Sequence, residues 1–97
     1  MIRHIVFFKF KEEASEGEQA ELVAALVKLQ EQIPLVKELE VAPDIGGKPN
    51  SYDIVLNSVF GNMDDLEAYA VHPDHVKVVE RVKALCQSSA KVDYTIR

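Results

Sequence analysis

The chain has 97 residues and a net charge of −5, with 47% hydrophobic and 28% charged residues. This length and composition are typical of one globular domain covering residues 1–97. The negative charge argues against nucleic acid and anionic membrane surfaces, which both need a basic face, and no apolar run approaches the roughly 20 residues that span a bilayer.

The cysteine content indicates the expected compartment. Cys86 is the only cysteine, so no internal disulfide can form. Since a signal peptide is not recognisable at the N-terminus either, we expect a cytoplasmic protein.

Residues 2–10 are rich in β-branched and aromatic side chains, which predicts a strand. Because side chains alternate along a strand, His4, Val6 and Phe8 share one face. A histidine on such an apolar face is more often a hydrogen-bonded core residue than a functional one. His4 therefore has two interpretations, core residue or site residue.

A helix is expected next, because Ser15 and Glu18 have the spacing of a capping box. It runs to about Ile33, before Pro34. Its apolar stripe has helical spacing and consists of Leu22, Leu26, Leu29 and Ile33, widened by Val23 and Val27.

Two further strands are predicted at residues 36–45 and 52–60, joined by a turn rich in glycine. In the second of them the side chains on one face are Tyr52, Ile54, Leu56 and Phe60, and those on the other are Val55 and Val59. Both faces of this strand are therefore partly apolar.

The stretch 69–75 concentrates titratable rings, namely Tyr69, His72 and His75. Pro73 predicts a corner, with one helix ending near Val71 and another beginning at the proline. In the first turn of that second helix the dipole disfavours imidazolium, so we expect His75 to be neutral at pH 7 and able to act as a general base.

The second helix carries apolar residues at helical spacing, which are Val76, Val79, Val82 and Cys86. Residues 90–97 alternate as a last strand. The order of elements predicts an α+β, ferredoxin-like βαββαβ fold, a four-stranded antiparallel sheet with its helices on one face. The uncovered face would carry Ile5, Phe7, Val55 and Val59, which predicts a homodimer.

The sequence resembles the stress-responsive dimeric α/β-barrel (Dabb) domain family in residues 1–10, 52–60, 66–76 and 92–95. The resemblance implies a homodimeric barrel with a pocket between each sheet and its helices. One plant branch of the family cyclises linear polyketides by an aldol step without a cofactor. Its reaction residues match His4, Tyr69 and His75 here.

The sequence is compatible with two functions. The first is a cofactor-independent cyclase or lyase acting on a small carbonyl compound, with His75 as base, Tyr69 as hydrogen-bond donor to an enolate, and His4 orienting the substrate or sharing the proton. Val6, Phe8 and His72 would complete the substrate contacts. The second is a non-catalytic stress-response or ligand-binding dimer, in which the histidines are structural.

A metal site is a weaker interpretation, because Pro73 disturbs the spacing of His72, Asp74 and His75. We therefore expect neither metal nor cofactor. A cavity shared by His4, Tyr69 and His75 would favour the enzyme, and rings facing bulk solvent would favour the dimer without chemistry.

Overall fold

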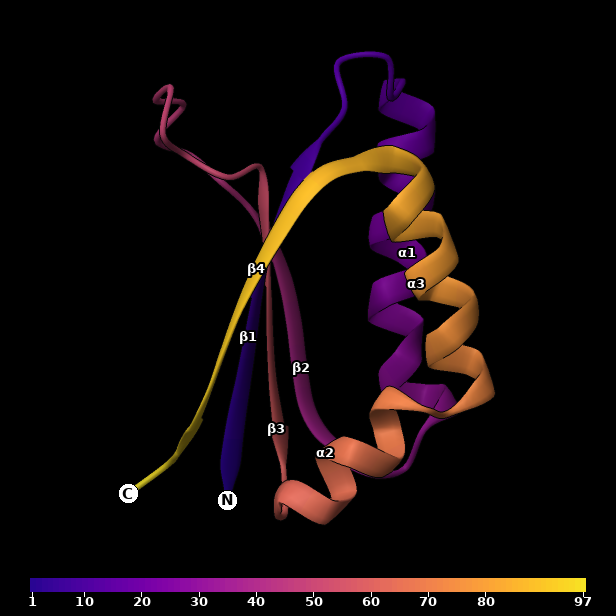
Figure 1. Ribbon diagram of the computed structural model, residues 1–97, viewed down its shortest axis with the longest axis vertical. Coiled ribbons are helices and arrows are strands. Elements are labelled where there is room, and N and C mark those ends of the chain that lie inside the picture. Colours follow the sequence, from indigo (N-terminus) through magenta and orange to yellow (C-terminus); the bar gives the residue numbers. More distant parts are fainter.

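The computed structural model describes residues 1–97 as one antiparallel sheet with all its helices on one side (Figure 1). The strands are β1 (Ile2–Phe10), β2 (Val36–Pro43), β3 (Ile54–Phe60) and β4 (Cys86–Thr95), in the spatial order β2-β3-β1-β4. The helices are α1 (Glu16–Gln32), α2 (Met63–Ala70) and α3 (Pro73–Leu85). The predicted ferredoxin-like fold is confirmed, with the second crossover divided into α2 and α3.

Helix α1 begins where the capping box predicts. The Ser15 hydroxyl accepts from the Glu18 backbone N–H at 3.1 Å, and the Glu18 carboxylate accepts from the Ser15 N–H at 3.0 Å. The predicted stripe from Leu22 to Ile33 is buried. Val27 was assigned to it wrongly, because its side chain lies on the solvent side of the helix.

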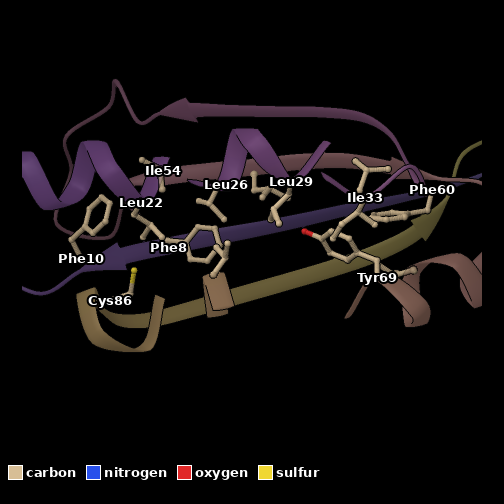
Figure 2. Packing of buried hydrophobic residues seen from close by; sticks show 14 of the residues in the cluster. Phe8, Phe10, Leu22, Leu26, Leu29, Ile33, Ile54, Phe60, Tyr69 and Cys86 are labelled. Carbon is tan, nitrogen blue, oxygen red and sulfur yellow. The ribbon is translucent and has the colours of Figure 1, made fainter. Parts of the chain in front are cut away.

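The core fills the space between α1 and the sheet (Figure 2). Phe8 and Phe10 of β1 and Ile54 and Phe60 of β3 meet the α1 stripe there. Tyr69 of α2 closes the same cluster at the end near Phe60. This packing fixes which face of β1 points to the helices, and that face carries His4.

The turn between β2 and β3 is longer than the sequence predicts. Strand β2 ends at Pro43 and β3 begins only at Ile54. Asp53, just before β3, bonds to β1: its N–H donates to the Phe8 carbonyl, and its carboxylate accepts from the Phe10 N–H. Tyr52 consequently lies against Phe7, with ring centroids 5.7 Å apart, instead of sharing the face of Ile54.

The last helix and strand meet earlier than predicted. Helix α3 ends at Leu85, and Cys86 is the first residue of β4, paired with Phe10 of β1. Cys86 is buried as expected, but it belongs to the sheet and not to the helix. On α3 itself Val78 is the buried valine, whereas Val76 is exposed.

The outer face of the sheet has no helix over it (Figure 1). Phe7 is 37% exposed and Val92 57%, and Ile5 and Val55 are half-buried. The prediction that Val59 belongs to this exposed patch is wrong, because Val59 is only 2% exposed. Its neighbours across the ladder are Arg3 and Glu38, whose long side chains can cover it.

Candidate active site

A cavity of about 390 Å³ lies between the sheet and the helices. Its walls are mostly apolar, with Phe8 and Leu56 from the sheet, Leu66 from α2 and Val78 and Val82 from α3. A volume of this size suits a small organic ligand. A larger, open groove between α1 and α3 is lined mainly by charged and polar side chains, and none of the predicted site residues lines it.

Tyr69 is 2% exposed, yet its ring lines the cavity. The ring lies 4.8 Å from the Phe60 ring and 4.3 Å from the His75 ring, centroid to centroid. The hydroxyl makes no hydrogen bond to the protein. Since no fully buried side-chain polar atom lacks a partner, its oxygen must be accessible from the cavity, and Figure 2 shows it pointing into the interior. Burial raises the pKa of Tyr69 well above its usual range, so the phenol stays protonated and can act as a donor.

His75 reaches the cavity from the first turn of α3, where His72 caps the helix and Pro73 begins it. Its Nδ1 lies 2.9 Å from the Ala70 carbonyl oxygen, which can only accept a hydrogen bond. The neutral ring therefore carries its proton on Nδ1 and leaves Nε2 as an acceptor.

The predicted neutral state of His75 agrees with its surroundings. Burial lowers the pKa of His75, and the nearby His4 and His72 lower it further, whereas the bond to the Ala70 carbonyl opposes the shift. Desolvation thus leads, and the helix dipole is not needed to explain the direction.

His4 lines the cavity from β1, next to the same tyrosine, with ring centroids 6.4 Å apart. Its Nδ1 is hydrogen-bonded to the carboxylate of Asp93, which lies directly opposite on β4. The other carboxylate oxygen of Asp93 is 3.3 Å from the Lys91 ammonium group. Burial raises the pKa of Asp93, but His4 and Lys91 outweigh this effect, so the pKa lies below its usual value and the group is a carboxylate.

The structure thus brings five of the six predicted site residues to one cavity: His4, Val6, Phe8, Tyr69 and His75. Their roles stay predictions. His72 is not among the residues that line the cavity, and its assignment as a substrate contact stays a prediction. As the N-cap of α3, its Nδ1 accepts the Asp74 backbone N–H at 3.1 Å.

The metal interpretation has no support in the geometry. No group of three metal-ligating side chains occurs, and Nδ1 of both His72 and His75 is engaged with the backbone. The structure also contains no helix of the length and apolarity that a membrane crossing needs.

Asp93 is the site residue that the sequence reasoning missed. The signal was present, because Asp93 alternates with Val92 and Tyr94 in the last strand and so faces the helices when those residues face outward. Finding it required the register between the first and last strands, which the sequence alone does not give.

Comparisons with known proteins agree with this architecture. The stress-responsive A/B barrel domain family matches residues 2–96. Olivetolic acid cyclase from Cannabis sativa is 26% identical over 98 residues, covering 99% of this chain and 97% of that protein. A stress-response A/B barrel domain-containing protein from Arabidopsis thaliana is 32% identical over 96 residues, and this chain spans only 36% of its length.

A solved structure gives the same fold. A dimeric protein of unknown function with a ferredoxin-like fold, from Bacteroides fragilis, is 30% identical and superimposes with a TM-score of 0.81. The match covers 98% of this chain and 95% of that one. Its dimeric state is described for that protein.

Proposed function

The chain belongs to the stress-responsive A/B barrel domain family, and from this premise we propose that it is an enzyme of the cyclase or lyase type that acts on a small carbonyl compound. The observation that carries the proposal is the convergence of His4, Tyr69 and His75 on one mostly apolar cavity. The full-length similarity to a protein named as a cyclase supports it further.

The proposed reaction begins with a proton transfer to His75. Its Nε2 takes a proton from the carbon next to a substrate carbonyl, and the electrons of the broken C–H bond move to the carbonyl oxygen as an enolate. The Tyr69 hydroxyl, which has no protein partner, donates a hydrogen bond to this oxygen.

The enolate carbon then attacks a second carbonyl of the same molecule. The new C–C bond displaces the electrons of that carbonyl onto its oxygen, and this alkoxide takes the proton held by the His75 imidazolium. No electrons leave or enter, so the sequence needs no redox cofactor. Phe8, Val6 and the valines of α3 would hold the apolar part of the substrate.

We also propose that the protein is a homodimer packed through the outer face of its sheet. Phe7, Val92 and Tyr94 are exposed there in a single chain, and the helices occupy the opposite face. Such a patch is typical of an interface between subunits. A solved relative is described as dimeric.

The chemistry can be tested without knowing the substrate. The protein is incubated in D₂O with a series of 2-alkanones, whose α-protons exchange slowly on their own, and deuterium uptake is followed by NMR. We expect catalysed exchange that improves with alkyl length and is abolished in His75→Ala. His72→Asn is the control, since that ring lies outside the cavity and asparagine can still cap α3.

Saturable binding of these ketones without any catalysed exchange would overturn the enzyme and favour the ligand-binding dimer. Equal exchange in wild type and His75→Ala would remove His75 as the base.

A further inference from the structure

We infer that Asp93 is a positioning residue for the proposed reaction: it fixes the tautomer of His4, so that His4 presents an unprotonated Nε2 to the cavity. The inference rests on the proposed function for its catalytic meaning. The tautomer itself does not depend on any activity.

The geometry behind the inference spans the two adjacent strands β1 and β4. His4 and Asp93 are direct partners in the antiparallel ladder, and both side chains point to the helix side. The side chains are 11% and 20% exposed, so water competes little for the bond between them. The Lys91 ammonium group lies 3.3 Å from the second oxygen of the carboxylate.

The chemistry of the acceptor decides the tautomer. A carboxylate offers no proton, so in the neutral state of His4 the Nδ1 atom must carry the hydrogen of the shared bond. The lone pair is then on Nε2. The lowered pKa of Asp93 keeps the group ionised at neutral pH.

His75 has the same tautomer for a different reason, because its Nδ1–H donates to the Ala70 carbonyl. The site thus combines two acceptor nitrogens, His4 Nε2 and His75 Nε2, with one donor, the Tyr69 hydroxyl. This pattern fits a ligand with one carbonyl oxygen flanked by an acidic C–H on one side and an O–H on the other. An enolised β-dicarbonyl has that pattern, and a simple ketone lacks the second donor.

The decisive experiment is ¹⁵N NMR of the imidazole rings at a pH of about 8, where protonated and unprotonated ring nitrogens have well-separated shifts. In the wild-type protein we expect His4 to be the Nδ1–H tautomer. Asp93→Leu has a similar shape and removes the acceptor of the Nδ1 hydrogen, so we expect the hydrogen of His4 to move to Nε2, which an unconstrained histidine ring prefers. Lys91→Met is the control, because it removes the other partner of Asp93, and His4 should keep the wild-type pattern.

A wild-type spectrum with the Nε2–H tautomer of His4 would overturn the inference, and this result needs no variant to fold. An unchanged Nδ1–H tautomer in folded Asp93→Leu would overturn it as well. If the tautomer moves as expected while no ketone or β-dicarbonyl reacts, the tautomer assignment stands and the proposed enzyme fails, so the two failures are distinguishable.

Discussion

Replacing Tyr69 by phenylalanine separates the structural and the chemical role of one buried ring. The ring packs against Phe60 and His75 and is almost completely buried, but the hydroxyl has no protein partner. Tyr69→Phe retains the ring and removes only the oxygen.

For Tyr69→Phe the structure predicts a small change in the free energy of unfolding and a large fall in the reaction rate. A net protein hydrogen bond contributes about 1 kcal/mol to stability, and here none is lost, so the free energy of unfolding should change by no more than about 0.5 kcal/mol. Loss of one donor to an oxyanion lowers the rate about 100- to 1,000-fold. Tyr69→Ala, by contrast, should cost about 3–5 kcal/mol, because it leaves a cavity in the core.

Urea unfolding measures the first quantity, and ketone exchange at saturating ligand measures the second. Tyr94→Phe on the exposed outer face is the control for removing a phenol oxygen. A loss of stability well above 1 kcal/mol in Tyr69→Phe would show that the hydroxyl has a structural partner, since about 1 kcal/mol is the usual net contribution of one hydrogen bond. An unchanged exchange rate would refute its role as the donor.

Three other predictions concern the interface, the thiol and the pH response. Phe7→Asp should yield monomers in sedimentation velocity, since it would bury an unpaired charge in the dimer. Val27→Asp on α1 is the control and should remain dimeric. A folded wild-type monomer at micromolar concentration would contradict the interface. Burial, reinforced by Asp53, raises the pKa of the Cys86 thiol, so thiol reagents should label the native protein far more slowly than the unfolded chain, and equal rates would refute this. Burial lowers the pKa of His75 below 6.5, so the unfolded chain binds the proton more readily and stability should decline as the pH falls below about 6.5. The urea midpoint of His75→Gln should decline less over the same pH range. An equal decline in wild type and variant would contradict the shift.

Local signals explain which parts of the fold were predictable. The capping box at Ser15 and the proline corner at His72 are defined by neighbours within a few residues, and both helices begin where these signals place them. The alternation in β1 likewise grouped His4 with the correct neighbours, because the strand is continuous from Ile2 to Phe10 and its side chains alternate without a break.

The errors arose where distant partners decide. Cys86 continues a helical spacing in the sequence, but pairing with Phe10 draws it into the sheet. Tyr52 continues the alternation of β3 in the sequence, but the strand begins only at Ile54, and Asp53 between them bonds to β1. The bond that makes His72 the N-cap of α3 is seen only in the structure. The pairing of Asp93 with His4 could be found only from the register between β1 and β4.

The partnership of His4 and Asp93 also sets an order of assembly, because 89 positions separate the two residues along the chain. During synthesis His4 is made first, and its partner follows 89 positions later with strand β4. Strand β4 lies at the edge of the sheet and is mostly exposed, so it is the strand best placed to detach while the core under α1 persists. Fraying of this edge would therefore dismantle the polar end of the cavity before the protein unfolds.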